Sequence, residues 1–140
     1  GIDQRGDLAF RLRVAMLGSF GISAPIGGWS EADRAVARDH VALYRSDIRA
    51  LVHHGDQYLL TPPPPLDGDG DWAAIWYVAK DGSHGALFAF RLGGAGSRVF
   101  PLPGLGMPRR IAGADAALVG DGMLVTLGEA FSSALVLVEV

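Results

Sequence analysis

Cysteine is absent from the 140-residue sequence, which excludes disulfide bonds, thiolate metal sites and a cysteine nucleophile. Asparagine is also absent, so the chain contains no N-glycosylation sequon. No apolar run reaches the roughly 18 to 20 residues that a membrane-spanning helix requires, and we expect no membrane partner. Lys80 is the only lysine among 12 basic residues, a bias that indicates a GC-rich bacterial genome.

Charge of either sign is also scarce. Charged residues make up 19% of the chain, and 15 acidic residues nearly balance 12 basic ones, for a net charge of −3. A surface that follows a phosphate backbone needs a basic excess, so we expect no nucleic-acid partner. Hydrophobic residues make up 49%, which is enough for a core in a chain of this length and indicates a globular protein.

Helical periodicity dominates the sequence up to about residue 55. A short amphipathic helix is indicated by apolar residues at i, i+4 and i+7, namely Phe10, Val14 and Leu17. A longer helix is predicted over about residues 30–52, because Ser30 is a suitable N-cap, Asp33 lies three residues later and Gly55 follows as a glycine cap. Its apolar stripe consists of Ala37, Val41, Tyr44, Ile48 and Leu51.

Short β-type runs separated by Gly and Pro follow from residue 56 onward. Lys80-Asp81-Gly82-Ser83 predicts a hairpin turn between two of them, and Pro62–Pro65 predicts an extended connector. Six or seven short strands with regular turns predict a small antiparallel β-sandwich. The candidate strands cover residues 57–61, 72–80, 85–92, 98–102, 109–112, 123–127 and 133–140.

Histidines in the sequence do not have the spacing of a metal site. Side chains of the adjacent His53 and His54 point about 100° apart on a helix, His40 and His84 stand alone, and no HExxH pattern occurs. We therefore interpret the helical histidines as helix-end residues that interact with terminal carbonyls.

Alternating aspartates at Asp67, Asp69 and Asp71 match the opening of a calcium-binding loop. However, Trp72 and Val78 occupy the positions where such a loop requires glycine and a bidentate glutamate. A solvated turn is the favoured interpretation, with a loose calcium site as the alternative. We assign no metal.

Trp72 and Trp76 fall on the same face of a predicted strand. Such alternation is typical of a sandwich core, but a flat aromatic face also stacks on sugar rings. The alternative function is therefore a free-standing carbohydrate-binding or assembly module that uses these two rings.

No catalytic constellation is recognisable. Gly18-Ser19-Phe20-Gly21 is not a nucleophile elbow, and the glycine runs at Gly93–Gly96 and Gly104–Gly106 are not followed by a helix that could hold a phosphate. Carboxylates on the long helix lie off its apolar stripe: Asp33, Asp39 and Asp47. We assign no catalytic residue and no cofactor.

Five segments, in this order along the chain, are similar to one known family: Phe10–Ile22, Trp29–Arg45, His54–Leu60, Gly104-Leu105, and Gly120 with Gly122-Met123. They resemble the C-terminal end of bacterial α-galactosidases of glycoside hydrolase family 36. The first two look like the last helices of the catalytic barrel. The third is similar to the Gly-Asp-x-Tyr-x-Leu start of the C-terminal β-domain, and the others to turns within that domain.

The resemblance implies an α+β segment of a larger enzyme. Residues 1–55 would be the last part of a (β/α)8 barrel, and residues 56–140 the C-terminal antiparallel β-sandwich. The parent would be a retaining glycosidase that acts on terminal α-galactosides, and the missing barrel would bind the substrate. The family's two catalytic aspartates lie on earlier barrel strands, so we expect the isolated chain to be inactive.

One segment departs from the family. Ile22-Ser23-Ala24-Pro25 replaces the usual Tyr-Glu-Leu-Asp at the end of the eighth barrel strand, which leaves the sugar preference open, including α-N-acetylgalactosaminides. Residues 1–7 lack a signal-peptide pattern, and we expect a bacterial cytoplasmic protein. The apolar stripe of the long helix predicts either self-association, with a homo-oligomer as one outcome, or packing on the sandwich.

Overall fold

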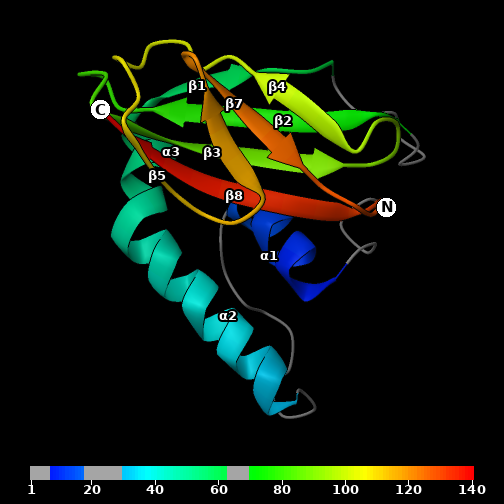
Figure 1. The fold of residues 1–140 in the computed structure, drawn as a ribbon. Helices are drawn as coiled ribbons and strands as arrows, with labels where there is room; N and C mark the ends of the chain where they lie inside the picture. The colour runs from blue at the N-terminus through cyan, green and yellow to red at the C-terminus, as the bar shows by residue number, and fades with distance from the viewer. Residues whose placement is uncertain (1–6, 18–29, 63–69) are drawn as a thin grey trace.

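The computed structural model describes residues 7–17, 30–62 and 70–140 (Figure 1). Ser19, Ser23–Pro25, Asp67 and Asp69, and most of the four-proline run, lie outside these ranges. None of the described helices is both long enough and apolar enough to span a bilayer.

Eight strands occur in the described residues, and each of the seven predicted strands corresponds to one of them within a few residues. The remaining strand, β6, was not predicted. The strands are β1 (Asp56–Leu59), β2 (Trp72–Val78), β3 (His84–Arg91), β4 (Ser97–Phe100), β5 (Arg110–Ala112), β6 (Ala116–Val119), β7 (Gly122–Thr126) and β8 (Ser132–Glu139).

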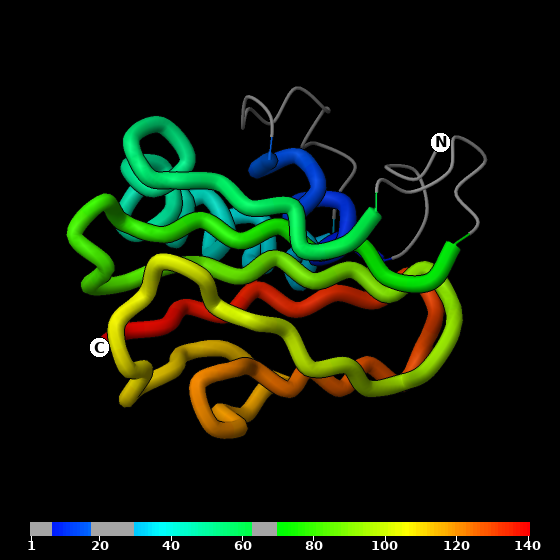
Figure 2. Tube along the Cα trace, turned by 90° about the horizontal axis from the view of Figure 1, so that it is seen from above, coloured from blue at the N-terminus to red at the C-terminus, as the bar shows by residue number. Residues whose placement is uncertain are grey.

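The strands form two antiparallel sheets. A five-stranded sheet has the order β1-β2-β3-β8-β5, and a three-stranded sheet has the order β4-β7-β6. Figure 2 shows β1, β2, β3 and β8 running alongside one another in that order. The expected combination of helices with antiparallel sheets is therefore confirmed.

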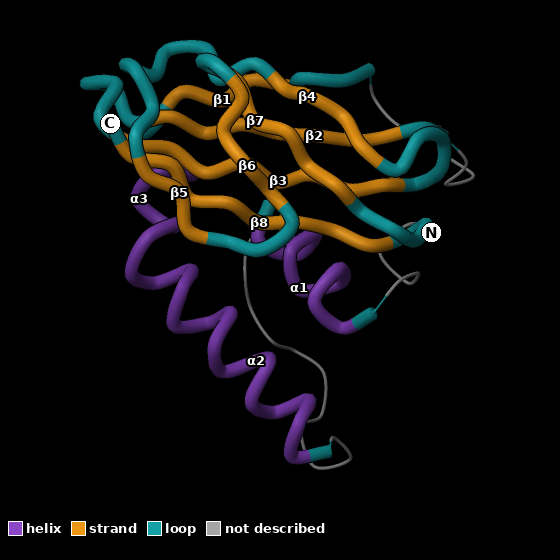
Figure 3. Tube along the Cα trace, in the orientation of Figure 1, coloured by secondary structure: helices purple, strands orange, loops and turns teal. Residues whose placement is uncertain are grey.

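The five-stranded sheet lies between the smaller sheet and a layer of helices (Figure 3). Because neighbouring residues of a strand point to opposite faces, Trp76 packs between the sheets while Tyr77 packs against the helices. The helix-side core joins Phe10 and Ile48 to Phe88, so the apolar helix faces are covered by the sheet rather than left open.

The first helix, α1 (Leu8–Met16), is capped by Asp7, whose Oδ1 accepts a hydrogen bond from the backbone N–H of Phe10 at 2.8 Å. Phe10 is fully buried and packs edge-on against Phe90 of β3, with ring centroids 5.2 Å apart. The ring contact joins the helix layer to the sheet.

The long helix begins as predicted. Ser30 Oγ accepts a hydrogen bond from the backbone N–H of Asp33 at 3.0 Å and caps α2 (Glu31–Leu43). A π-helical segment, η3 (Tyr44–Ile48), and α3 (Arg49–His54) continue the helix. The π segment was not predicted, because the apolar spacing of four and three residues is regular through it.

The glycine after the helix is needed for a different reason from the one predicted. Gly55 has φ of −81°, which is extended rather than left-handed. A Cβ at this position would lie 2.7 Å from the carbonyl oxygens of both Leu51 and Val78. The glycine therefore permits the end of α3 to approach β2 closely.

Candidate functional site

The helical histidines have different environments. His40 of α2 is half-buried, and its Nδ1 lies 2.8 Å from the carbonyl oxygen of Val36. Burial is the main cause that lowers the pKa of His40. His53 and His54 are exposed at the end of α3, with ring centroids 6.3 Å apart. Within the described residues no three His, Cys, Asp or Glu side chains lie close enough together to hold a metal ion.

Asp71, the described member of the aspartate series, takes part in a turn. Its carbonyl oxygen accepts hydrogen bonds from the N–H groups of Leu92 and Gly93, both at 2.8 Å, and its carboxylate lies 3.6 Å from Arg98 Nη1. A Cβ on Gly94, whose φ is +73°, would lie 1.8 Å from Asp71 Oδ1. Glycine at position 94 therefore permits its loop to approach the Asp71 side chain closely.

The interpretation of Trp72 and Trp76 as core residues is confirmed, and the alternative, an aromatic sugar platform, is wrong. Trp72 is 3% exposed and Trp76 is fully buried, both in the core between the sheets. Their indole N–H groups donate to the carbonyl oxygens of Ala95 and Pro103, each at 2.8 Å. Rings enclosed in this way cannot stack on a sugar at the surface.

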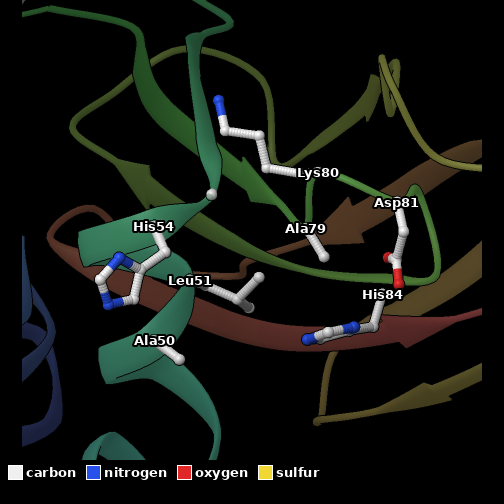
Figure 4. A pocket seen from close by; sticks show the side chains of 8 residues that line it. Ala50, Leu51, His54, Ala79, Lys80, Asp81 and His84 are labelled. Atoms are coloured by element: carbon white, nitrogen blue, oxygen red, sulfur yellow. The ribbon is translucent and has the colours of Figure 1, made fainter.

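A groove opens where the end of α3 meets the β2–β3 hairpin (Figure 4). It has a volume of about 320 Å³. Small apolar side chains of both elements form much of its lining, and four polar residues complete it. The lining residues are Ala50, Leu51, His54, Gly55, Ala79, Lys80, Asp81 and His84.

The hairpin loop has the sequence predicted for a turn, and its conformation creates a polar network. The N–H of Ala79 donates to the carbonyl oxygen of His84 at 2.9 Å, and Gly82 has φ of +72°. Asp81 Oδ1 accepts hydrogen bonds from Ser83 Oγ at 2.6 Å and from Ser83 N at 3.0 Å. Ser83 Oγ also lies 2.9 Å from His84 Nδ1.

Electrostatics of the groove follow from these contacts. The hydrogen bonds from Ser83 stabilise the carboxylate of Asp81 and lower its pKa. Lys80 Nζ lies 2.6 Å from Asp56 Oδ1, and this hydrogen bond raises the pKa of Lys80. In Figure 4 the Lys80 ammonium points away from the other groove side chains, and the His54 ring lies apart from Asp81 and His84. His84, in contrast, extends toward the helix turn at Ala50.

This arrangement fits binding better than catalysis. It orients one imidazole beside an apolar surface, but its serine hydroxyl is held by the carboxylate rather than aimed at the groove. From the sequence, Asp81 and Ser83 are predicted to be turn residues, and His84 stands alone. The hairpin itself brings these three residues together, but only the packing of α3 beside it places Asp81 and His84 at a groove, and no local pattern signals that packing.

No protein-family model matches this chain. Curated proteins with similar sequences are α-galactosidases. Alpha-galactosidase 2 of Hypocrea jecorina is 33% identical over 86 residues, which are 61% of this chain and 11% of that protein. Alpha-galactosidase AgaA of Geobacillus stearothermophilus is 34% identical over 85 residues, again 61% of this chain and 11% of that protein. The chain thus spans about a tenth of the length of these curated relatives.

Solved structures show a similar fold over most of the chain. The GH36 alpha-galactosidase AgaB of Geobacillus stearothermophilus has a TM-score of 0.73 and 27% identity, over 97% of this chain and 20% of that protein. A variant of AgaA in complex with 1-deoxygalactonojirimycin has a TM-score of 0.69 and 28% identity, over 93% of this chain and 19% of that one.

Proposed function

We propose that this chain, which shares sequence and fold with α-galactosidases of glycoside hydrolase family 36, is the C-terminal, non-catalytic segment of such an enzyme. The observation that carries the proposal is the combination of the two kinds of likeness. Relatives 33% and 34% identical over 61% of the chain are α-galactosidases, and GH36 structures cover 93% and 97% of it.

In this proposal, residues 1–55 are the end of a (β/α)8 barrel, with the helix from Ser30 as its last helix. Residues 56–140 are a C-terminal β-sandwich made of the two described sheets. Support comes from the covered hydrophobic faces. The inner faces of both sheets share one core, and the helix-facing side of the larger sheet shares another with α1 and the long helix. A sandwich fused in this way to the barrel end would brace the barrel mechanically.

The parent enzyme would hydrolyse terminal α-galactosides with retention of configuration. Retaining glycosidases use two carboxyl groups about 5 to 5.5 Å apart, one as the nucleophile and one as the acid/base. Barrel enzymes carry such residues at the carboxyl ends of several strands. The 140-residue chain would supply neither group and would bind no substrate at an active site, so we propose that it is inactive alone.

The location, assembly and sugar preference of the parent are part of the same proposal. We propose that the parent enzyme is located in the bacterial cytoplasm and that it forms a homo-oligomer. We assign α-galactosides as its substrates because its relatives are named as α-galactosidases. An α-N-acetylgalactosaminide preference would be the outcome if the departure at Ser23–Pro25 reshapes the active-site mouth.

The first test is the coding sequence that precedes Gly1. The proposal expects several hundred codons with alternating strand and helix patterns. The encoded parent and the 140-residue chain would then be assayed on an aryl α-galactoside, with an aryl α-N-acetylgalactosaminide alongside. We expect turnover of the galactoside by the parent and none by the chain. Turnover by the chain alone, or a parent inactive on both substrates, would overturn the proposal.

A further inference from the structure

A hydrogen-bond chain on the β2–β3 hairpin involves Asp81 and His84, two residues that line the groove of Figure 4, and its proton positions can be worked out. Ser83 Oγ has a single proton and lies between Asp81 Oδ1 at 2.6 Å and His84 Nδ1 at 2.9 Å. An ionised carboxylate only accepts hydrogen bonds, so the hydroxyl proton of Ser83 points to Asp81. The hydroxyl oxygen then accepts from His84, which places a proton on Nδ1.

For the neutral ring, this assignment determines what His84 offers to the groove. In a neutral imidazole with the proton on Nδ1, Nε2 carries a lone pair and accepts hydrogen bonds. Figure 4 shows the ring extending from the hairpin toward the helix turn, with Nε2 at its far end. Nε2 of a neutral His84 is therefore an oriented acceptor held in place through Ser83, beside the Asp81 carboxylate and the apolar groups of Ala50, Leu51 and Ala79.

Charge at the groove disfavours anionic ligands. The long helix ends here, and its C-terminus carries a partial negative charge that repels anions. The Asp81 carboxylate adds to this repulsion, while the ammonium of Lys80 is paired with Asp56 and points away. Metal cations lack a ligand set, because no group of three suitable side chains lies together in the described residues.

Size limits the ligand as well. Pockets that bind small molecules have volumes of about 300 to 1,000 Å³, so a groove of about 320 Å³ is at the small end of this range. A neutral molecule with hydroxyl donors and an apolar face satisfies the acceptor, the lining and the volume together.

We propose that this groove is a binding site for a small neutral polyhydroxy ligand, such as a monosaccharide, with His84 Nε2 as its hydrogen-bond acceptor and Ser83 as the residue that positions His84. The choice of galactose as the first probe rests on the proposed function. The acceptor, the apolar lining and the volume of the groove support the ligand class.

The first experiment determines the tautomer. Long-range ¹H–¹⁵N correlation spectra of the labelled 140-residue chain, recorded at about pH 8, distinguish a protonated ring nitrogen from an unprotonated one. We expect His84 to carry its proton on Nδ1, and we expect Ser83→Ala to abolish this preference without unfolding the chain. A wild-type ring protonated on Nε2 would overturn the proposal.

The second experiment measures binding. Backbone amide spectra would be recorded during titration with galactose, with glucose and with inorganic phosphate. We expect one or both sugars to shift the amide resonances of Ala50, Ala79 and His84, and phosphate to leave them unchanged. Shifts with phosphate alone, or with none of the probes, would contradict the proposal.

Variants decide whether His84 is the acceptor. His84→Ala is expected to weaken sugar binding by up to about tenfold, as the loss of one hydrogen bond does. His84→Gln retains an acceptor and is expected to recover part of the affinity. His53→Ala, at an exposed histidine of α3 that does not line the groove, is the matched control. Equal affinity of the His84→Ala and wild-type chains would overturn the assignment, whatever the activity of the parent enzyme.

Discussion

Gly85 lies directly against the indole ring of Trp76. A Cβ at Gly85 would be 2.3 Å from Trp76 Cη2 and 2.6 Å from the carbonyl oxygen of Tyr77. The two residues belong to the neighbouring strands β2 and β3, and the buried indole occupies the space that any other side chain at position 85 would need. The absence of one side chain therefore makes room for one of the largest side chains of the core.

Gly85→Ala is accordingly expected to destabilise the fold by about 3 kcal/mol, because the added methyl group must displace the ring or the strand. Gly128→Ala is the matched control, since nothing lies within 4 Å of a Cβ at that position. Urea denaturation followed by tryptophan fluorescence measures both free energies of unfolding. Similar midpoints for the two variants would contradict the described contact.

Phe10→Ala tests whether the helices and the sheet unfold together. Phe10 is fully buried against Phe90, so we expect a loss of about 3 to 5 kcal/mol and a single unfolding transition. Arg11→Ala changes the exposed neighbour on the same helix and is expected to cost about 0.5 kcal/mol or less. Far-ultraviolet circular dichroism follows the secondary structure, and the near-ultraviolet signal follows the aromatic packing. Different unfolding midpoints from the two signals would show that α1 does not unfold cooperatively with the sheet.

Removal of the helix cap gives a smaller and well-defined effect. Ser30→Ala deletes the hydrogen bond from Asp33 N–H and is expected to cost about 1 kcal/mol. Ser46 lies exposed within the same long helix, where its hydroxyl donates to Asp47 Oδ2 at 2.6 Å. Ser46→Ala is expected to be nearly neutral, because the higher helix propensity of alanine offsets the loss of this exposed hydrogen bond. Thermal melts of the pair measure the difference, and a reversed order would refute the capping role.

The buried environment of His40 predicts a pH dependence. Burial lowers the pKa of the folded-state His40 below its ordinary value of 6.5, so the unfolded chain binds the proton first as the pH falls. The contribution of His40 to the free energy of unfolding is therefore fully present above about pH 6.5. It decreases through the window between that value and the lower folded-state pKa. Arg13 nearby adds to the effect by repelling the imidazolium form.

Denaturation at a series of pH values measures this dependence. His40→Gln is expected to remove this contribution to the fall in stability below pH 6.5, the ordinary pKa of the histidine. His53→Gln, at an exposed position of α3, is expected to retain it. An identical slope in the wild type and the His40→Gln variant would contradict the prediction.

The family resemblance indicated by the order of the sequence segments is confirmed by α-galactosidase relatives in sequence and by GH36 structures in fold. The division at residue 55 stays a prediction. Phe10, Ile48 and Phe88 share one core across that position, and such contacts between distant parts of a chain leave no local pattern from which a boundary can be read.

Local signals in the sequence determined the start of the long helix, the β2–β3 hairpin and seven of the eight described strands. Each depends on residues within one turn or one strand, as Ser30 and Asp33 illustrate. The missed strand, β6, has the sequence Ala-Ala-Leu-Val, and alanine has a low strand propensity. Pairing with β7 stabilises this strand, although its own residues favour a strand only weakly.

Tertiary structure alone decided the burial of Trp72 and Trp76, the requirement for glycine at position 55 and the existence of the groove. An alternating strand pattern says that alternate residues share a face, but not whether another sheet covers that face. Likewise, His84 and Leu51 line the same groove only because α3 and the hairpin pack together. Hydrogen bonds between near neighbours select local conformation, whereas burial of distant apolar surfaces selects which elements meet, and that selection depends on the whole chain at once.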